Sequence, residues 1–592
     1  MPTVSVGRDH LFERLGKVYT QDEFEALCFD FGIELDDVTT EKAIIRKEKH
    51  LDSEEAGEEE EVIYKIEVPA NRYDLLCLEG LARALRIYLG KDEIPIYRVS
   101  SIQRDCLIKL HVKPETALVR PFVVCAILRG ITFDEASYES FIELQEKLHQ
   151  NICRKRTLVA IGTHDLDTIQ GPFSYEAQSP QEINFVPLKQ VRSFRADELM
   201  EYYKADNKLK AFLHIIKDSP VFPVIYDSNR TVLSLPPIIN GAHSAITLQT
   251  RNVFIECTAT DLTKAKTVLN TMVTMFSEYC KEKFEVEPVE VVHSDGNTNI
   301  YPDLSITTMK VDLSDIGGSI GVSLPEDEVI LLLKKMQLQT EESSSQSGDS
   351  SIIVSIPPTR SDILHPRDVM EDVAIAYGYN NIPKSKPKCL TMGGRQPLNR
   401  FSDKIRAEVS RAGYLEVLTW ILCSHEDNFS MLKRKDVGNA VIIANPRSAE
   451  FQVVRTSLMS GLLKTLRHNK DHPKPIKIFE VGDVVIIDET NDVGAANNRR
   501  LAALYCNVYS GFEEIMGLVE RIMKIVVKPH EKSIQHHYEP SDLAEFFPNR
   551  QCSISFKGRR IGNFGIVHPE VLAEFKIQDP CSFFEIDIQS LL

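Results

Sequence analysis

The chain lacks several features that mark common classes of protein. It has 592 residues and a formal net charge of −17, so it has no positive excess of the kind found in proteins that coat nucleic acid. An acidic protein can still bind nucleic acid through a local basic patch. No stretch approaches the ~20 apolar residues of a membrane span, and the N-terminal segment, with Asp9 and Glu13, has no long apolar run of a signal peptide. We therefore expect no membrane segment and a cytoplasmic location.

The twelve cysteines include no Cys-x-x-Cys pair. This spacing argues against a zinc ribbon, a thioredoxin motif or a dense disulfide framework. Buried, reduced thiols of a cytosolic protein are the expectation instead. The chain also shows no tandem repeat and no heptad run, which argues against a solenoid or a coiled coil.

The chain is long enough for several domains. Its mixture of apolar strands and amphipathic helices predicts a multidomain α+β fold. We expect an N-terminal α+β domain over 1–113, a larger α+β domain over 114–285, a small domain over 300–384 and a last domain over 395–592. The runs 52–61 and 340–351 are predicted to be polar loops without core-forming residues.

Four helices are predicted with defined ends. One begins at Gln21 and stops at Gly32, and a second begins near Asp74, after a turn at 69–71. A third, over 137–156, is amphipathic and ends in the basic residues Arg154, Lys155 and Arg156. A fourth follows Thr260 and Asp261, either of which suits a helix cap.

The segment "PPTRSDILHPRDVMEDVAIAYGYNNIP", residues 357–383, gathers four carboxylates. Pro366 suits the first position of a helix. In that helix Asp368, Glu371 and Asp372 lie at i, i+3 and i+4 and share a face, while Val369, Val373 and Tyr377 form an apolar stripe with Ala376 beside it. Asp362 lies just upstream and could fold over the acidic face.

Two interpretations of the four carboxylates remain open from spacing alone. The helix dipole favours acids in the first turn by about 0.3–1 kcal/mol each, which accounts for Asp368 but less well for Glu371 and Asp372. A hard divalent cation such as Mg²⁺, which prefers oxygen ligands, would account for all four. His365 is the one nearby base, and it is better assigned to the start of the helix.

The same segment resembles the metal-site segment of the β subunit of phenylalanyl-tRNA synthetases. The shared features are Pro357 and Arg360, Asp362, Asp368, the adjacent pair Glu371–Asp372, and the ending Gly378–Tyr379 with Ile382–Pro383. The resemblance implies that Asp362, Asp368, Glu371 and Asp372 bind Mg²⁺ beside the contact with a catalytic α subunit.

The resemblance extends over nearly the whole chain in family order. Residues 64–85 are similar to the family's N-terminal domain, residues 141–175 and 234–266 to its editing domain, and residues 445–469, 476–485 and 561–572 to its C-terminal module. The chain ends at Leu592, soon after the last of these, without room for the anticodon-binding domain of bacterial relatives. It therefore looks like the shorter archaeal and eukaryotic cytosolic type.

The resemblance implies a non-catalytic and editing subunit of a heterotetramer of two α and two β chains. With the α subunit, which would bind ATP and phenylalanine, it would attach phenylalanine to its tRNA. The C-terminal module would be a catalytically silent copy of a class II synthetase domain. Arg455 lies near where a phosphate-binding arginine would be sought, but no Gly-rich helix ending in arginine follows it. Pairing of Arg455 with an acidic neighbour or with the partner is the better interpretation.

The editing domain would hydrolyse tyrosyl-tRNA, because a pocket for phenylalanine rejects one added hydroxyl only modestly. Glu256 and Thr258 alternate along a predicted strand and face the same side. We hypothesise that Glu256 accepts a hydrogen bond from the tyrosine hydroxyl, with Ser234, Asn240 and Thr258 lining the site. The alternatives are an edge-strand charge at Glu256, an ordinary strand residue at Thr258 and a simple turn at Asn240–Gly241.

Three questions stay open from the sequence. The basic residues 154–156 could contact tRNA phosphates or form a solvated helix end. Ala259 stands where relatives are expected to have glycine, which allows a pure scaffold with a decayed editing pocket. A stand-alone Mg²⁺-dependent hydrolase that uses the Asp362 cluster is the rival from another class, and it would need a nearby base or nucleophile.

Overall fold

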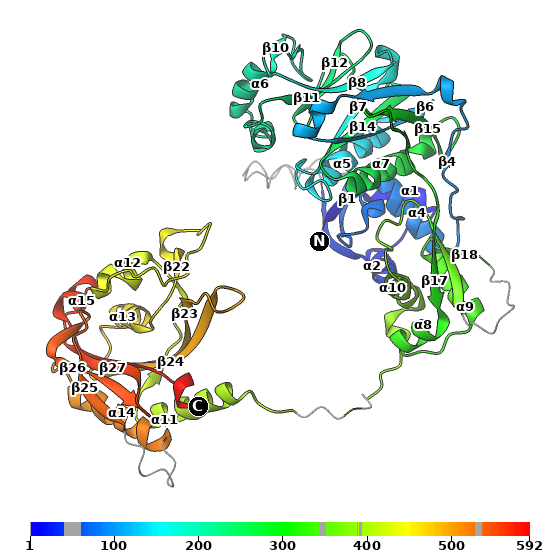
Figure 1. The fold of residues 1–592 in the computed structure, drawn as a ribbon. Helices are drawn as coiled ribbons and strands as arrows, with labels where there is room; N and C mark the ends of the chain where they lie inside the picture. Colours follow the sequence, from blue (N-terminus) through cyan, green and yellow to red (C-terminus); the bar gives the residue numbers. More distant parts are fainter. Residues whose placement is uncertain (1, 41–60, 342–350, 387–388, 390–392, 527–535) are drawn as a thin grey trace. The chain divides into compact units, whose positions relative to one another are not determined.

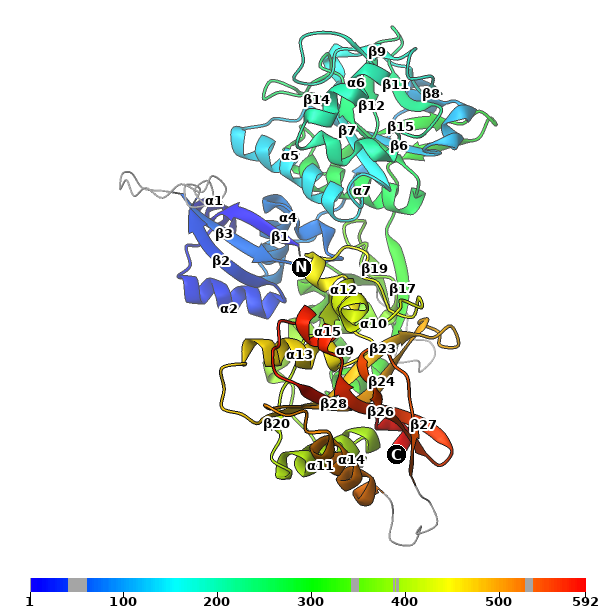
Figure 2. The ribbon, with the colours of Figure 1, turned by 90° about the vertical axis from the view of Figure 1, so that its left-hand side faces the viewer.

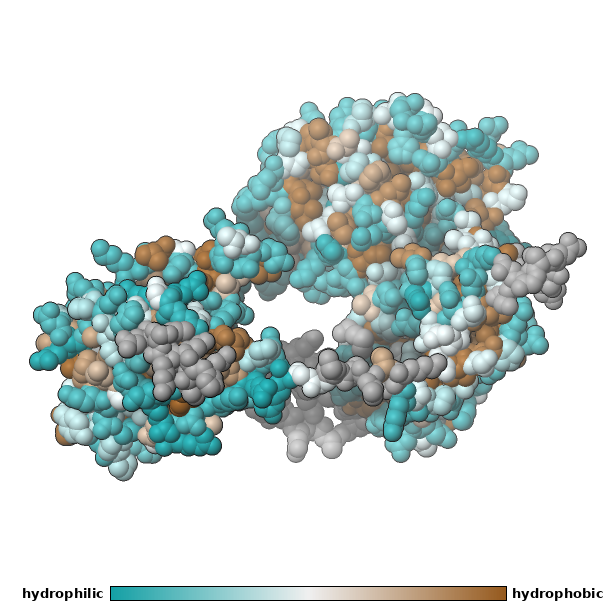
Figure 3. Space-filling model, turned by 60° about the horizontal axis from the view of Figure 1, so that its bottom comes forward, coloured by the Kyte–Doolittle hydropathy of each residue, from teal (hydrophilic) through white to brown (hydrophobic). Residues whose placement is uncertain are grey.

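The computed structural model describes residues 2–40, 61–341, 351–386, 389, 393–526 and 536–592. The chain forms two compact units, Met1–Lys386 and Pro387–Leu592, and each is described by itself (Figure 1). Most of the two predicted polar loops, 52–61 and 340–351, lies outside the described residues. Among those described, no helix is both long enough and apolar enough to cross a membrane. On the face drawn in Figure 3, hydrophobic residues form separate groups among hydrophilic ones.

The first unit begins with a three-stranded antiparallel sheet in the order β1-β3-β2. Its elements are β1 (Thr3–Gly7), α1 (Arg8–Leu15), α2 (Gln21–Phe31), β2 (Glu34–Thr40), β3 (Val62–Glu67) and α4 (Leu78–Tyr88). The predicted helix at Gln21 is confirmed. Thr20 and Glu23 form a capping box at its start, and Gly32 ends it at a φ of 88°, a left-handed conformation that glycine adopts without strain.

The helix predicted to begin near Asp74 begins four residues later, at Leu78. Residues Tyr73–Leu75 form a separate 3₁₀ turn. The reason is a buried ion pair: Arg72 donates to both carboxylate oxygens of Asp74, at 2.9 and 2.8 Å. That pair fixes the turn before the helix starts.

The largest sheet of the first unit has the path β13-β12-β11-β8-β5-β15-β6-β14-β7, with β4 and β16 pairing to β15. The strands are β4 (Arg98–Val99), β5 (Ile108–Val112), β6 (Phe122–Arg129), β7 (Val159–Asp165), β8 (Phe173–Gln178), β11 (Phe222–Tyr226), β12 (Val232–Leu235), β13 (Ile239–Asn240), β14 (Asn252–Ala259), β15 (Glu285–Val292) and β16 (Thr298–Tyr301). Helices α5 (Glu135–Gln150) and α7 (Leu262–Phe276) lie together beside the sheet, and α7 packs on β6 and β14 (Figure 1). A smaller pair, β9 (Asn184–Phe185) and β10 (Phe194–Arg195), precedes α6 (Ala196–Tyr202).

The helix expected over 137–156 ends at Gln150, and residues 151–157 form turns. The basic residues 154–156 are therefore not helical. By contrast, the cap predicted for the following helix is confirmed, because the Asp261 carboxylate accepts the backbone N–H of Lys264 at the start of α7.

The third part of the first unit is a three-stranded sheet, β17-β19-β18, with three helices. The elements are β17 (Thr307–Asp312), α8 (Leu313–Ile320), α9 (Glu326–Lys335), β18 (Gln339–Glu341), β19 (Ser351–Ile356) and α10 (Pro366–Tyr377). Helix α10 packs on α8, α9 and α2, and α4 packs on α9. This part is therefore joined to the N-terminal part through helices.

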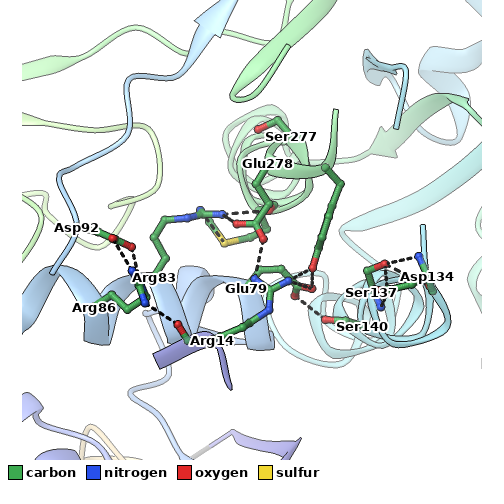
Figure 4. A network of polar contacts seen from close by, with 12 residues as sticks. Arg14, Glu79, Arg83, Arg86, Asp92, Asp134, Ser137, Ser140, Ser277 and Glu278 are labelled. Carbon is green, nitrogen blue, oxygen red and sulfur yellow. Dashed lines mark hydrogen bonds and ion pairs between the residues drawn. The ribbon is translucent and has the colours of Figure 1, made fainter. Parts of the chain in front are cut away.

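A buried polar network joins the N-terminal part to the large sheet (Figure 4). Glu79, on α4, accepts hydrogen bonds from Ser140 Oγ at 2.6 Å and Tyr279 Oη at 2.8 Å. Glu278 pairs with Arg14, at 2.7 Å, and with Arg83. Each carboxylate thus contacts groups from a different element, which fixes how the two parts pack.

The second unit is built on a seven-stranded sheet in the order β20-β23-β24-β28-β27-β26-β25, whose strands apart from β25 are labelled in Figure 2, and it also has the small sheet β21-β22. Its elements are α11 (Pro397–Arg411), β20 (Leu415–Glu416), β21 (Leu422–Cys423), α12 (His425–Asn428), β22 (Val453–Val454), α13 (Met459–His468), β23 (Ile476–Ile487), β24 (Ala495–Cys506), α14 (Phe512–Val526), β25 (His537–Pro540), β26 (Phe546–Phe556), β27 (Arg559–Val567), α15 (Pro569–Glu574) and β28 (Cys581–Asp587). One hydrophobic core includes residues of α11 and α14, and another includes residues of α13 and α15. The apolar runs 476–487 and 500–506 of the sequence lie in β23 and β24.

Candidate functional site

The predicted editing residues lie on three strands of the large sheet, β12, β13 and β14. Strand β14, which carries Glu256 and Thr258, runs between β6 and β7 and is not an edge strand. Ser234 on β12 pairs in register with Asn240 on β13, so these two residues flank the connection through Pro236 and Pro237. Ser234, Glu256 and Thr258 are buried, whereas Asn240 is half-buried. The edge-strand interpretation of Glu256 is therefore wrong.

The structure joins two of these residues directly. Ser234 Oγ donates to Glu256 Oε1 at 2.8 Å. Glu256 lies opposite Gly162 on β7, and a Cβ at residue 162 would collide with the Glu256 carboxylate. Glycine at this position therefore gives the carboxylate its room.

Asn240 completes the same corner of the sheet. Its Nδ2 lies 3.5 Å from the backbone oxygen of Thr163, so it links β13 to β7. The next residue, Gly241, approaches the backbone oxygen of Val232 too closely for a side chain. The hairpin that carries Ser234 and Asn240 is thus held against the strands that flank Glu256.

His164 was not found by sequence reasoning. It lies on β7 two residues after Gly162 and is fully buried. Its Nδ1 is 2.8 Å from Ser244 Oγ, and its Nε2 is 3.8 Å from Glu256 Oε1. The signal in the sequence was weak, because a single histidine in an apolar strand more often serves only the core.

Four buried polar atoms of this region have no hydrogen-bond partner among the residues that the structure describes: Arg120 Nε, His164 Nε2, Glu256 Oε2 and Thr258 Oγ1. A buried polar atom without a partner costs about 1–3 kcal/mol. Arg120 is itself part of the region, since its Nη2 donates to the backbone oxygen of Thr258 at 2.8 Å, and burial lowers its pKa. Unmet hydrogen bonds gathered on adjacent strands are the property expected of a binding site for a polar group.

The acidic segment around α10 has a different character. Arg360, which is buried, donates to both oxygens of Asp362 at 3.0 and 2.8 Å and to Asp372 Oδ2 at 2.7 Å. Burial opposes the ionisation of Asp362, but the Arg360 guanidinium outweighs it and lowers the pKa of that carboxyl. Burial is the larger effect at Asp372, and its pKa is raised.

Helix α10 begins at Pro366, as predicted, and Asp368 caps it. Asp368 Oδ2 accepts the backbone N–H groups of Leu364 and His365, each at 2.8 Å, and His365 is the N-cap residue. The helix-start interpretations of Asp368 and His365 are therefore confirmed. Glu371 is exposed to solvent.

These four side chains do not fit a single magnesium site as they lie. A guanidinium already stands between Asp362 and Asp372, and Asp368 is bonded to the backbone. Within the described ranges, no group of three or more His, Cys, Asp or Glu side chains is arranged to hold a metal ion. Magnesium binding by Asp362, Asp368, Glu371 and Asp372 stays a prediction, and no chemical step is derived through it.

Arg455 in the second unit pairs with an acidic neighbour, as expected. Its Nη1 lies 2.8 Å from Glu480 Oε1, and its Nε donates to the backbone oxygen of Asp483 at 2.9 Å. Both side chains of the pair are buried. This guanidinium is therefore occupied within the chain.

Models of four protein domains match the chain. Residues 1–91 match the "Phe-tRNA synthetase beta subunit B1 domain", residues 133–281 the "B3/4 domain", residues 309–379 the "tRNA synthetase B5 domain", and residues 382–588 the "Phenylalanyl tRNA synthetase beta chain CLM domain". The candidate editing residues fall within the second of these matches, and Asp362, Asp368, Glu371 and Asp372 fall within the third.

Relatives match over the full length. The chain is 64% identical to "Phenylalanine--tRNA ligase beta subunit, cytoplasmic" of Arabidopsis thaliana and 50% identical to "Phenylalanine--tRNA ligase beta subunit" of Homo sapiens, with 100% of each chain covered. A crystal structure of an N-terminal fragment of the phenylalanyl-tRNA synthetase beta subunit from Pyrococcus horikoshii is 32% identical, with a TM-score of 0.55 over 64% of this chain and 99% of that one.

Proposed function

The chain belongs to the phenylalanine–tRNA ligase beta-subunit family, and we propose that it acts as the non-catalytic and editing subunit of that aminoacyl-tRNA synthetase in the cytoplasm. In this proposal a catalytic alpha subunit binds ATP and phenylalanine and attaches phenylalanine to its tRNA. Two alpha and two beta chains form the complex. The beta chain supports the alpha subunit and removes tyrosine that has been attached by mistake.

The lack of catalysis by the second unit is supported by Arg455. An arginine that binds ATP phosphates must present a free guanidinium, because phosphate is recognised through a fork of N–H donors. Arg455 instead uses its guanidinium on Glu480, Thr419 and the backbone of residue 483. Activation of phenylalanine is therefore assigned to the alpha subunit.

The observation that carries the editing proposal is the unmet oxygen of Glu256. Its Oε1 is bonded to Ser234, whereas its Oε2 is buried without a partner. A tyrosine hydroxyl that donates to Oε2 would satisfy it, and phenylalanine would leave it unmet. Sites built to bond a hydroxyl reject the analogue without it by about 10⁴–10⁵-fold in comparable cases.

His164 gives the same hydroxyl a donor. When Ser244 donates to His164 Nδ1, the proton of the neutral ring lies on Nε2, which has no partner in the structure. A phenol between Nε2 and Oε2 would accept from the first and donate to the second. Both atoms of the hydroxyl would then be used, which is the basis of selectivity for tyrosine.

The remaining residues serve the ester rather than the phenol. Hydrolysis adds water across the ester carbonyl, releasing tyrosine and leaving the tRNA hydroxyl free. We assign the orientation of this water to the polar side chains of Thr258, Asn240 and Ser234. Thr258 Oγ1 is buried without a partner and is free to bond such a water.

The test compares hydrolysis of tyrosyl-tRNA and phenylalanyl-tRNA by the purified complex. The variant E256A removes the acceptor, whereas E256Q keeps the shape and the Ser234 contact. Both are expected to slow tyrosyl-tRNA hydrolysis by at least about 10²-fold, or about 2.7 kcal/mol, without raising hydrolysis of phenylalanyl-tRNA. Unchanged tyrosyl-tRNA hydrolysis in E256A would exclude this role for Glu256.

The two rival functions have less support. A magnesium-dependent hydrolase at the Asp362 cluster would need free carboxylates and a base, but Arg360 and the backbone hold the carboxylates and His365 caps the helix. A pure scaffold would not need the three unmet polar atoms on β7 and β14 and the fourth on Arg120, just before β6. Wild-type complex that fails to distinguish the two charged tRNAs would favour the scaffold.

A further inference from the structure

We propose that the basic turn, residues Arg154, Lys155 and Arg156, binds the phosphodiester backbone at the 3′ end of the charged tRNA through the side chains of Arg154 and Lys155. The inference rests on the editing function proposed above, because it assigns to this turn the part of the substrate that adjoins the ester. Its basis is the conformation of the turn, its attachment to the candidate editing site, and two cations that the fold leaves unpaired.

The backbone of the basic turn is left-handed at three successive residues, with φ angles of 45°, 52° and 65°. None of the three is glycine, and a left-handed residue with a side chain costs roughly 1–2 kcal/mol. Such conformations persist where surrounding contacts fix them, and they gather at binding and catalytic sites.

Several hydrogen bonds fix this conformation. The Lys155 backbone N–H donates to the His149 oxygen at 2.7 Å. Arg120 Nη1 donates to the backbone oxygens of Arg156 and Thr157, at 3.3 and 3.1 Å. Since Arg120 also bonds the backbone of Thr258, one buried guanidinium connects the turn to the strand that carries Glu256.

Arg156 attaches the turn to the hairpin of the editing site. Its Nη1 lies 3.4 Å from the Pro237 oxygen and 3.1 Å from the Ile238 oxygen. Its guanidinium also stands 4.4 Å from the centroid of the Phe212 ring. The connection between Ser234 and Asn240 is therefore held by the last residue of the turn.

Arg154 and Lys155 are exposed, and neither takes part in any ion pair among the described residues. Helix α5 ends at Gln150, so the favourable effect of a helix C-terminus does not extend to these residues. Two adjacent unpaired cations on a chain of net charge −17 attract a polyanion.

The polyanion that we expect at this turn is the tRNA itself, because it is part of the substrate. The ester to be cleaved is on its terminal nucleotide, so the preceding phosphates arrive beside the site whenever the acyl group enters. An acidic peptide has no such reason to lie here. Each phosphate contact made by a cation adds a salt-dependent contribution to binding.

The experiment uses the double variant R154E/K155E in the purified complex. Hydrolysis of tyrosyl-tRNA is expected to show a KM raised by about 10–100-fold with kcat changed less than about threefold. The slope of log(kcat/KM) against log salt concentration should fall by about 1–2, as for the loss of two phosphate contacts. The exchange R154K/K155R, which keeps both charges, should restore most of the KM.

The matched control is K281E/K283E, which makes the same change in charge at two exposed lysines of the same unit. An equal rise of KM in this control, or an unchanged KM in R154E/K155E, would overturn the proposal. Phosphate-ethylation interference at the last nucleotides of uncharged tRNA gives a readout independent of hydrolysis. Wild type should be sensitive to ethylation there and R154E/K155E insensitive, even if tyrosyl-tRNA is not cleaved.

Discussion

The buried carboxylates in two regions of the first unit have opposite kinds of partner. Around α10, Arg360 pairs with Asp362 and Asp372, so charge is balanced by charge. On β14, Glu256 Oε1 is bonded to Ser234 and lies 3.8 Å from His164 Nε2, whereas Oε2 has no partner among the described residues. The sequence made the first region look like the ligand site, because its four acids are close together. We therefore base the binding proposal on the unmet hydrogen bonding at Glu256 and not on the density of charge around α10.

The largest effect should come from breaking the paired region. R360M removes the guanidinium bonded to the buried Asp362 and Asp372 and leaves Arg72 as the other cation that acts on them. Breaking a buried ion pair from one side costs about 3–5 kcal/mol. We expect calorimetric unfolding of the purified protein to show a loss of this size. E256Q is the comparison from the other region, where a change below about 1 kcal/mol is expected.

Magnesium sharpens this test. If the acidic residues can bind Mg²⁺ as well as pair with Arg360, millimolar Mg²⁺ should recover much of the stability that R360M loses. EDTA should then remove that gain. No response of R360M to either would assign the neutralisation of Asp362 and Asp372 to Arg360 alone. If R360M lost less than about 1 kcal/mol of unfolding free energy, the paired region around α10 would not differ in stability from the Glu256 region as we expect.

The second effect concerns the room that Glu256 occupies. In G162A the new methyl group would collide with the Glu256 carboxylate, and overpacking of a core costs about 1–3 kcal/mol. Displacement of the Glu256 carboxylate by this methyl group should also abolish the preference of hydrolysis for tyrosyl-tRNA over phenylalanyl-tRNA. G318A is the control, because a Cβ there meets no atom within 4 Å, and it should leave unfolding and hydrolysis unchanged or raise stability slightly.

A third, smaller effect separates the two partners of the tyrosine hydroxyl. H164A removes the donor and keeps Glu256, so hydrolysis of tyrosyl-tRNA should fall by about tenfold, or about 1.4 kcal/mol. This loss should be smaller than that of E256A, since the carboxylate is the acceptor of a charge-assisted hydrogen bond. Equal hydrolysis by H164A and wild type would leave Glu256 as the sole selecting group.

The fold followed from the sequence where local rules decide it. The capping box at Thr20, the glycine at residue 32 and the proline at residue 366 set helix ends that the structure confirms. Local rules failed where a distant contact decides. Helix α4 begins at Leu78, later than predicted, because Arg72 is bonded to Asp74. The basic turn leaves the helical conformation because it is bonded to Arg120, His149 and the hairpin.

The candidate sites divide in the same way. The residue types at 234, 240, 256 and 258 were found through resemblance, and the alternation along β14 placed two of them on one face. His164 could not be found, because its role depends on pairing between β7 and β14 and on Ser244. Arg360 was visible in the motif, yet its contacts with Asp362 and Asp372 join residues that spacing alone does not bring together.

The smallest effect is the pH dependence of the paired region, and its sign can be worked out. The folded pKa of Asp362 is lowered, so its contribution to stability is present above the unfolded pKa and is lost as the pH falls through the folded value. The folded pKa of Asp372 is raised, so its ionisation opposes folding, and that opposition is relieved as the pH falls through the raised value. Between about pH 5 and 3, on either side of the ordinary aspartate pKa of about 3.9, the two effects therefore act in opposite directions. D372N should therefore lose stability on acidification more steeply than wild type, and D362N less steeply, each by up to about 1 kcal/mol over this range. The measurement is the free energy of unfolding of each variant across this pH range. Identical slopes of that free energy against pH in D372N and D362N would mean that Arg360 does not affect the two carboxyl groups in the different ways that the geometry indicates.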